Sequence, residues 1–377
     1  MKTMRNPFIT SGYVSAEYFC DREEESRQLV REVTNGNNLA LISTRRMGKS
    51  GLIKHCFQLP AIKERYYTFF VDIYDTRSLR DFTFALSKEI VEVLKPRGRR
   101  ALESFVNSVR SLQAAFALDI NGLPTPSLGL GDIQVPASTL DEIFRYLEHA
   151  DKPCLVAIDE FQQIAEYGIE NIEATLRTYV QRNNNTRFIF AGSQRHVMSG
   201  MFLSPARPFY QSVSMMHLDR IDLEAYIPFA RRHFTAAGKS IEVEAVTAIY
   251  QRFEGITWYV QKVLNTLYDR TPWGGVCKEE EIDEAIRLIV GSYDYAYSET
   301  IFRLPERQKE LLIAIAKEGR AQAVTSATFT KKHHLVSASS VQAALRGLLE
   351  KDFVTQEKGI YQTYDRFLAI WLTERYG

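Results

Sequence analysis

The chain has few cysteines, no marked excess of either charge and no long apolar run. Its four cysteines, Cys20, Cys56, Cys154 and Cys277, stand singly, and none forms a Cys-x-x-Cys pair or lies near a histidine at zinc-ligand spacing. This pattern predicts reduced, buried thiols in a cytoplasmic protein. Because 47 Lys and Arg balance 46 Asp and Glu, the global charge gives no argument for binding to nucleic acid or a membrane surface.

Segments that would direct the chain to a membrane are also missing from the pattern. No apolar stretch approaches the length of a membrane span, and the opening "MKTMRNPFITSGY" lacks the apolar run of a signal peptide. We therefore expect no membrane association. The 377 residues exceed one ordinary hydrophobic core, which predicts two or three domains.

Short apolar runs alternate with helical patterns over the first 220 residues. The runs span residues 39–43, 67–73, 154–160, 187–193 and 212–218. Strands that are apolar on both faces and alternate with helices predict an α/β fold, with a parallel sheet covered on both sides. The segment 95–137 interrupts this alternation. A helix is expected at 101–116, and the Gly and Pro residues after it predict an excursion from the sheet, either a hairpin or a mobile loop.

The remainder of the chain shows two further sequence patterns. Helical patterns alone fill residues 222–291, which predicts a compact helical domain. Three helices and a hairpin with its turn at 357–359 then predict a winged helix. The predicted domains are 1–219, the α/β part; 220–297, the helical part; and 298–377, the winged helix.

The segment "STRRMGKSG", residues 43–51, lies between the first strand and a helix. Gly48, Lys49 and Ser50 fit the second half of a P-loop, in which N–H groups at a helix start attract phosphate oxygens. Lys49 would reach the β- and γ-phosphates, and the Ser50 hydroxyl would bind Mg²⁺. The predicted nucleotide-binding residues are Ser43, Thr44, Arg45, Arg46, Met47, Gly48, Lys49, Ser50 and Gly51.

Ser43 stands where the P-loop pattern has its first glycine. A serine can serve there if its φ angle stays negative, or if it accepts a mildly strained left-handed conformation. The alternative interpretation is a chance Gly-Lys-Ser at an exposed helix start.

Two acidic residues, Asp159 and Glu160, end the apolar run "CLVAIDE". A strand this apolar must be central, so its carboxyl end lies at the ligand-binding edge of the sheet. Asp159 would hold Mg²⁺, and Glu160 would orient or deprotonate the attacking water. Ser193 ends the run "RFIFAGS" and would contact the γ-phosphate or the water. An ordinary strand-end turn is the alternative for each of these segments.

With these motifs the chain resembles the archaeal-type ATPases, P-loop NTPases of the AAA+ and STAND kind. The resemblance rests on "FCDREEESRQL" (19–29), "STRRMGKSGLI" (43–53), "LVAIDEFQQI" (155–164), "FAGSQRHVMSGMF" (190–202) and "YQTYDRFLAIWL" (361–372). It implies an ATP-binding core, a helical lid and a C-terminal winged helix, with ATP and Mg²⁺ bound. It also implies catalytic roles for Glu160 and Ser193, a phosphate role for Lys49 and metal-binding roles for Ser50 and Asp159. The chain departs from it at Ser43, and at Thr257, where related STAND proteins have a proline; Thr257 receives no role.

Several residues near these motifs have two interpretations. One of Arg45 and Arg46 would face the phosphates. The alternative is that these loop arginines pair with an acid or lie in solvent. Arg195 and Arg207 follow the Ser193 strand and are candidates for an arginine finger, which nothing in one sequence tests. Pro7, Phe8 and Phe19 would pack beside adenine, or would serve as core anchors.

Three functions fit these motifs. The first is an ATPase switch, in which ATP binding and hydrolysis rearrange core, lid and winged helix. The second is an initiator-like, ATP-regulated DNA-binding protein; residues 296–377 hold 12 Lys and Arg against 9 Asp and Glu, which is a weak basic excess for that role. Docking of an unidentified protein partner, or closing of the lid, by the winged helix is therefore favoured over DNA. The third is a nucleotide-binding pseudo-ATPase. An oligomer is compatible with all three.

Overall fold

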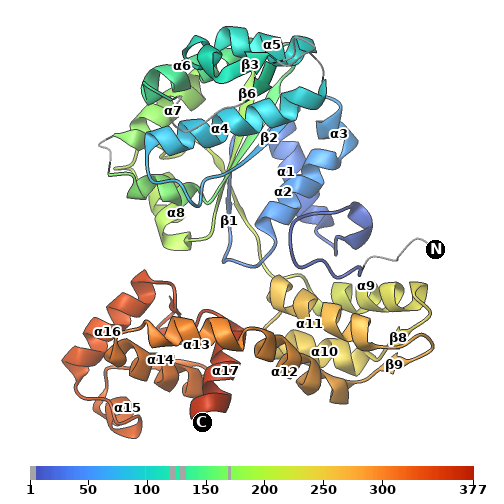
Figure 1. The fold of residues 1–377 in the computed structure, drawn as a ribbon, viewed down its shortest axis with the longest axis vertical. Coiled ribbons are helices and arrows are strands. Elements are labelled where there is room, and N and C mark those ends of the chain that lie inside the picture. The colour runs from blue at the N-terminus through green and yellow to red at the C-terminus, as the bar shows by residue number, and fades with distance from the viewer. Residues whose placement is uncertain (1–5, 98, 119–123, 127–132, 169–170) are drawn as a thin grey trace. The chain divides into compact units, whose positions relative to one another are not determined.

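The computed structural model describes residues 6–97, 99–118, 124–126, 133–168 and 171–377, and the chain divides into two compact units (Figure 1). The sheet unit comprises Ile9–Tyr226 and Ile256–Trp258. The helical unit comprises Met1–Phe8, Ile227–Gly255 and Tyr259–Gly377. The predicted lid and winged-helix segments thus fall in the same unit, and the two predicted boundaries between the three domains remain predictions.

A five-stranded parallel sheet forms the centre of the sheet unit, in the order β2-β5-β6-β1-β7. All six residues of β5 are buried, as its apolar run predicts. The α/β fold class with a parallel sheet is therefore confirmed. The strands are β1 (Leu39–Ile42), β2 (Tyr67–Asp72), β5 (Cys154–Asp159), β6 (Thr186–Gly192) and β7 (Ser214–His217).

Side chains alternate between the two faces of this sheet, and each face has its own core. Ala40 and Ile42 of β1 join one apolar cluster, and Leu39 and Leu41 join the other. The first face is covered by α4 (Leu79–Leu94), α6 (Pro136–His149), η5 (Phe161–Glu166), α7 (Ile172–Arg182) and α8 (Arg195–Leu203). The second is covered by α1 (Glu23–Thr34), α2 (Lys49–Gln58) and α3 (Pro60–Lys63), and η1 (Ala16–Tyr18) precedes α1.

The segment 95–137 leaves the sheet, as predicted. The expected helix is α5 (Arg99–Ser108), but it ends earlier than predicted and gives way to the 3₁₀-helix η3 (Arg110–Ala115). The short η2 (Lys95–Arg97) precedes it, and β3 (Phe116–Leu118) pairs with β4 (Pro124–Pro126) as an antiparallel hairpin. The mobile-loop alternative concerns residues 119–123 and 127–132, which lie outside the described residues.

The first part of the helical unit holds α9 (Leu223–Ala236), α10 (Val243–Arg252), α11 (Thr257–Arg270), η6 (Glu279–Glu281), α12 (Ile282–Ser292) and α13 (Asp294–Phe302), of which α9 and α11 begin in the sheet unit. The prediction of helices alone is wrong in one detail, because β8 (Ser240–Ile241) pairs with β9 (Val276–Cys277) in parallel. Two-residue strands are too short to show a period in the sequence.

The second part of the helical unit is a winged helix with α14 (Glu306–Glu318), α15 (Ala327–Lys332), α16 (Ala338–Glu350), a three-stranded sheet and the closing α17 (Arg366–Tyr376). The strands are β10 (Ala321–Gln322), β11 (Val354–Glu357) and β12 (Ile360–Thr363), in the order β10-β12-β11. The Ser337 hydroxyl caps α16, and Gly319 ends α14 with a φ of 66°. Lys358 and Gly359 form the hairpin turn with positive φ angles, as such a tight turn requires.

All four cysteines are free and buried, as predicted. Among the helices in the described part of the chain, none combines the length and the apolarity of a membrane span.

Candidate functional site

The loop from Ser43 to Gly48 joins β1 to α2. Ser43 is fully buried, and its N–H donates to the carbonyl oxygen of Gly192 (3.3 Å). Positive φ angles occur at Arg46 (69°) and Gly48 (93°) but not at Ser43. The loop therefore turns at its later positions, and Ser43 has a backbone conformation that any residue adopts.

A buried arginine holds the loop from one side. Arg22, only 3% exposed, donates to the carbonyl oxygens of Met47 (3.2 Å) and Asp219 (2.6 Å), and it pairs with Glu25. Hydrogen bonds from a charged donor are stronger than neutral ones, so Arg22 restricts the loop's backbone. The sequence shows Arg22 in the "FCDRE" segment, but nothing in that pattern says where its side chain lies.

The segment that opens α11 holds the same loop through three further contacts. The Trp258 N–H donates to the Arg46 carbonyl oxygen (3.0 Å), and the Thr257 hydroxyl donates to that of Met47 (3.3 Å). The Arg46 guanidinium lies over the Trp258 ring, 4.5 Å from its centre, and the indole N–H donates to Thr10 (2.9 Å). Thr257, which received no role from the sequence, thus supports the loop.

Asp159 at the end of β5 meets the start of α2 directly. The Ser50 hydroxyl donates to its Oδ2 atom in a short hydrogen bond, and the residue is only 4% exposed. Burial raises the pKa of the Asp159 carboxyl above its usual range, although the charge of Lys49 and the Ser50 hydroxyl act in the opposite direction. Added positive charge at this carboxylate would therefore relieve a cost of burial.

Glu160 follows in a left-handed conformation (φ 56°) that turns its side chain toward the loop. Its Oε1 atom lies 3.8 Å from Lys49 Nζ, and its Oε2 atom accepts from the Ser193 hydroxyl (2.6 Å) and from Gln162 Nε2 (2.5 Å). Burial raises the pKa of Glu160, but Lys49, Ser193, Gln162 and Arg45 together hold it below its usual range. The carboxylate is therefore ionised at neutral pH.

The structure brings the predicted catalytic and metal-binding residues together. β6 lies between β1 and β5 in the sheet, so Ser193 reaches the space between the loop and the acids. Parallel strands place the carboxyl ends of all three at one edge, which explains the convergence of Lys49, Ser50, Asp159 and Glu160. The sequence missed Gln162 and Gly192, which belong to the same cluster.

The other predicted nucleotide-binding residues differ in what they present. Met47 is 3% exposed and its side chain packs in the core, so it offers the loop only its backbone. Arg45 Nε donates to Ser193 Oγ (3.3 Å), whereas Arg46 lies over Trp258. Of the two arginines, Arg45 is therefore the one at the acidic cluster. Thr44 is exposed and Gly51 lies in the first turn of α2, where the N–H groups have no partner within the helix.

The two arginine-finger candidates lie after β6. Arg207 donates to both carboxylate oxygens of the largely buried Glu173, with Nε at 3.1 Å from one of them. A bidentate pair of this kind holds Arg207 within its own subunit. Arg195 is the first residue of α8.

The two aromatic residues of the N-terminal segment belong to different units. Phe8 is fully buried in the helical unit among Phe229, Phe234 and Tyr268, so it is a core anchor. Phe19 stacks on the His55 ring at 4.5 Å in the sheet unit. Neither arrangement by itself indicates adenine.

Mg²⁺ prefers oxygen ligands and keeps several waters, so a complete protein cage is not needed. Within the part of the chain that the structure describes, no group of three or more His, Cys, Asp or Glu side chains is placed to hold a metal ion. Ser50 Oγ and Asp159 Oδ2, already in contact, offer two oxygen donors beside the loop. This donor set fits Mg²⁺ completed by phosphate oxygens and water.

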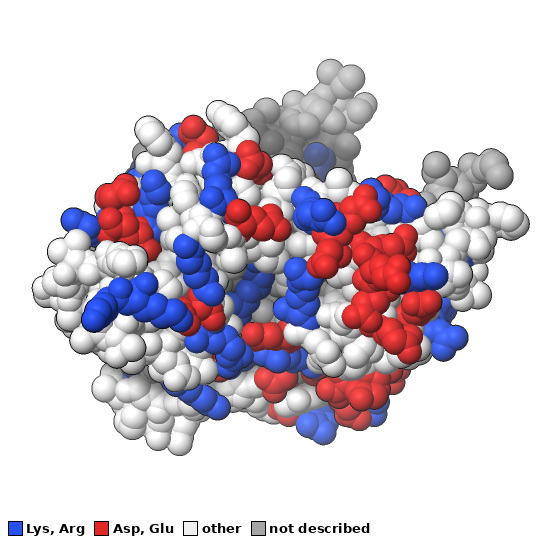
Figure 2. Space-filling view, turned by 90° about the horizontal axis from the view of Figure 1, so that it is seen from below, with Lys and Arg blue, Asp and Glu red and all other residues white. Residues whose placement is uncertain are grey.

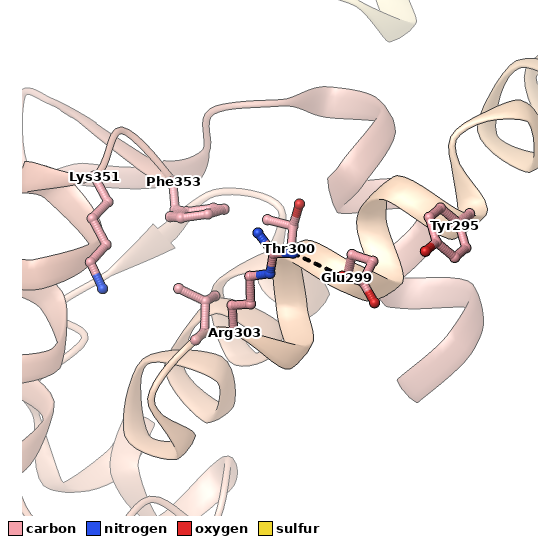
Figure 3. A pocket seen from close by; sticks show the side chains of 7 residues that line it. Tyr295, Glu299, Thr300, Arg303, Lys351 and Phe353 are labelled. Carbon is pink, nitrogen blue, oxygen red and sulfur yellow. Dashed lines mark hydrogen bonds and ion pairs between the residues drawn. The ribbon is translucent and has the colours of Figure 1, made fainter.

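A separate hollow of about 500 Å³ lies in the helical unit (Figure 3). Its lining includes Arg303, paired with Glu299 at 3.1 Å, and the aromatic rings of Tyr295 and Phe353. None of its lining residues belongs to the loop or to the acidic cluster.

Comparisons with known proteins establish the fold. A family model described as a probable winged helix domain matches residues 295–374, and no curated protein matches the sequence. A Walker-type ATPase of Pyrococcus abyssi is similar over 97% of this chain and 99% of its own, with a TM-score of 0.65 and 18% identity. The ORC2 protein of Aeropyrum pernix, in ADPNP and ADP complexes, is similar over 98% of this chain and 96% of its own, with a TM-score of 0.59 and 13% identity.

The ORC1 protein of Aeropyrum pernix, in complex with DNA, is similar over 94% of this chain and 93% of its own, with a TM-score of 0.53 and 13% identity. At such identities the likeness concerns the fold. The chain shares the fold of these structures, with a five-stranded parallel sheet followed by helical and winged-helix parts. The resemblance to the archaeal-type ATPases is confirmed at this level.

Proposed function

We propose that the protein binds ATP at the Ser43–Ser50 loop and hydrolyses it with Mg²⁺. One observation carries the proposal: Lys49 and Ser50 at the start of α2 meet Asp159 and Glu160 at the end of β5, with Ser193 beside them. A lysine, a hydroxyl and two carboxylates around a helix N-terminus are what a nucleoside triphosphate and its metal require.

Each side chain then has a distinct role. The N–H groups at the start of α2 and Lys49 Nζ bind the β- and γ-phosphates. Ser50 and Asp159 hold Mg²⁺, which when bound neutralises phosphate charge. Glu160 Oε1 accepts a proton from the attacking water as its oxygen bonds to the γ-phosphorus and the bond to the β-phosphate oxygen breaks. Ser193 orients Glu160 through Oε2, and Arg45 adds positive charge beside them.

The loop's attachment to Thr257 and Trp258 supports a switch. Both residues open α11, which continues directly into the helical unit. Phosphates that bind the loop would displace the Arg46 and Met47 carbonyls, and the displacement would reach α11 through these hydrogen bonds. ATP shifts the equilibrium between arrangements only if it prefers one of them.

ATP binding and phosphate release by the purified chain test the proposal. Glu160→Gln should retain ATP and lose phosphate release by about a hundredfold or more, the usual range for a catalytic base. Lys49→Ala should weaken ATP binding itself. Lys54→Ala is the matched control, because Lys54 lies on the same helix and its Nζ is over the Phe70 ring.

Three results of this experiment separate the candidates. Wild-type turnover abolished by Glu160→Gln supports the ATPase. ATP binding with no wild-type turnover identifies a pseudo-ATPase. No ATP binding, or equal loss in Lys49→Ala and Lys54→Ala, contradicts the nucleotide site.

DNA binding is the second candidate, because a winged-helix model matches residues 295–374 and the similar ORC1 structure contains DNA. Ser339, Gln342 and Arg346 are exposed along α16. Against this candidate, Glu318 pairs with Lys332 (2.6 Å) and His333 (2.7 Å), which reduces the positive charge of the basic segment "TKKHH" at 330–334. Figure 2 shows basic and acidic side chains intermixed over the face it displays.

Binding to duplex DNA measured against salt tests this candidate. A DNA-binding role predicts affinity that falls steeply between 50 and 200 mM salt, by about a factor of ten or more for a few phosphate contacts, and weaker binding for Arg346→Ala. Glu374→Ala, on α17, serves as a surface control. Absence of binding at low salt would leave docking of a protein partner as the role of the winged helix.

A further inference from the structure

Gln162 contacts the acidic cluster, although the motif at 155–164 assigned it no role. It lies in η5, two residues beyond Glu160, and only 4% of it is exposed. Its Nε2 atom is 2.5 Å from Glu160 Oε2 and 3.4 Å from Ser193 Oγ, and its Oε1 atom is 3.3 Å from the Ser193 nitrogen. One side chain thus contacts both the acid and the hydroxyl that orients it.

The partners fix the orientation of the Gln162 amide. The Ser193 N–H can only donate, so it requires the amide oxygen. Glu160 Oε2 is an acceptor, as it is toward the Ser193 hydroxyl, so it requires the amide nitrogen. Rotation of the amide by 180° would lose both hydrogen bonds at once, so the Gln162 side chain is held in one orientation.

Gly192 provides the space for the Gln162 side chain. A Cβ atom at Gly192 would lie 2.6 Å from Gln162 Oε1 and 2.4 Å from Met198 Sδ, both closer than such atoms approach. Its φ angle is not positive, so the glycine is needed for close approach and not for backbone conformation. The end of β6 is therefore shaped to admit the Gln162 side chain.

We infer that Gln162 is a positioning residue for the proposed hydrolysis, an inference that rests on the proposed function. Both hydrogen bonds from Gln162 and Ser193 go to Glu160 Oε2, while Oε1 faces Lys49 at 3.8 Å. Holding Oε2 directs Oε1 toward the phosphate side, where it takes the proton from water. Gln162 does not contact the reacting atoms; it acts through Glu160.

Steady-state hydrolysis by Gln162→Met tests the inference, since methionine matches the length of glutamine but makes no such hydrogen bonds. We expect kcat to fall about ten- to a hundredfold, the range for losing a hydrogen bond to a charged group. KM and ATP affinity should stay within about twofold, because the lysine and the loop are intact. Gln162→Ala, which leaves room for water, should give the same split between kcat and KM.

Gln163→Met is the matched control: the neighbouring glutamine in the same 3₁₀-helix should tolerate the change. A second comparison uses the Glu160→Gln background in single-turnover assays. If Gln162 acts through Glu160, adding Gln162→Met there should change the residual rate less than about twofold. If Gln162 had a merely structural role, Gln162→Met would lower the residual rate of Glu160→Gln by the same factor as it lowers the wild-type rate.

The outcomes distinguish the role of Gln162 from the proposed ATP hydrolysis. Wild-type kcat in the Gln162 variants, a parallel loss of affinity, or a full additional loss in the Glu160→Gln background would overturn the inference while the ATPase stands. An inactive wild-type chain would overturn the proposed function and this inference together.

Discussion

At the scale of single residues, backbone angles decide which loop positions need glycine. Gly48 has a φ of 93°, a backbone conformation in which a side chain is strained. The φ angle of Ser43 is not positive, so its position does not need glycine. The nearest atom to a Cβ at Gly48 is Thr257 Cγ2 at 4.0 Å, so the obstacle at that position is conformational and not a clash. The loop should therefore tolerate change at its first position and resist it at its sixth.

Two substitutions express this contrast. Ser43→Gly, which restores the P-loop pattern, should leave ATP affinity within about twofold and lower the free energy of unfolding by about 0.5–1 kcal/mol, because glycine gains more freedom in the unfolded chain. Gly48→Ala should cost about 1–2 kcal/mol from left-handed strain and weaken ATP binding. Urea unfolding and ATP titration measure both effects, and equal losses of affinity in the two variants would contradict the assignment.

The chemically distinctive residues of the site were accessible to sequence reasoning, and its supporting residues were not. Lys49, Asp159 and Glu160 occur in a strand–loop–helix and strand-end context that predicts their roles. Gln162 and Arg22 carry no such pattern, because their importance depends on hydrogen bonds across the fold. A buried glutamine is recognised only when the atoms around it are known.

At the scale of elements, the packing of α4 on β2 contains a half-buried acid, Glu89. Glu89 Oε1 accepts from the Phe70 N–H (3.1 Å) at the sheet. Burial raises the pKa of the Glu89 carboxyl, with the Phe70 N–H and Lys54 acting in the opposite direction. Its native pKa thus exceeds its unfolded value, so the stability it contributes is present below the unfolded pKa and is lost as pH rises through the native pKa.

Glu89→Gln should therefore stabilise the protein at neutral pH, because the amide oxygen can still accept from Phe70 and no charge is buried. The gain in the free energy of unfolding should shrink as pH falls toward 4, where the wild-type acid is also neutral. Urea unfolding from pH 4 to pH 8 measures the difference. The exposed Glu64→Gln is the control, and a gain that grows toward acid pH would refute the sign.

Element predictability followed the length and regularity of each pattern. The apolar runs of β5 and β6 and the period of α4 predict those elements well. α13 went unpredicted because its segment has no clear apolar face, and Tyr295 and Phe302 are exposed. The pairs formed by β8, β9 and β10 involve two residues each and are determined by tertiary contacts.

At the scale of the whole molecule, the proposed switch depends on the short segment Ile256–Trp258. These residues belong to the sheet unit, while the rest of α11 belongs to the helical unit. The division was not predictable from the helical pattern of 257–271, which is continuous through Trp258. Because the Arg46 guanidinium and the Trp258 ring pack at 4.5 Å, the loop and the start of α11 are held together by side chains as well as by backbone.

Trp258→Ala should therefore separate ATP binding from rearrangement of the units. The backbone hydrogen bond to Arg46 remains in this variant, and Lys49 and Ser50 are unchanged. ATP affinity should therefore stay within about fivefold, as expected for the loss of about 0.5–1 kcal/mol of cation–π attraction. Fluorescent labels on cysteines introduced at the exposed Lys88 and Arg346 report the distance between units, since the four natural cysteines are buried. ATP should change this distance in the wild type and change it less in Trp258→Ala.

Trp273→Ala is the matched control, because Trp273 is 84% exposed in the helical unit, where its ring lies beside Gly238. It should retain the full ATP-dependent change in distance. The same change in wild type and Trp258→Ala would show that the signal travels by another route, and the hydrogen bond from Thr257 to Met47 would then be the next contact to remove. A wild-type distance that ATP leaves unchanged would contradict the switch itself, because a ligand with equal affinity for two arrangements shifts neither.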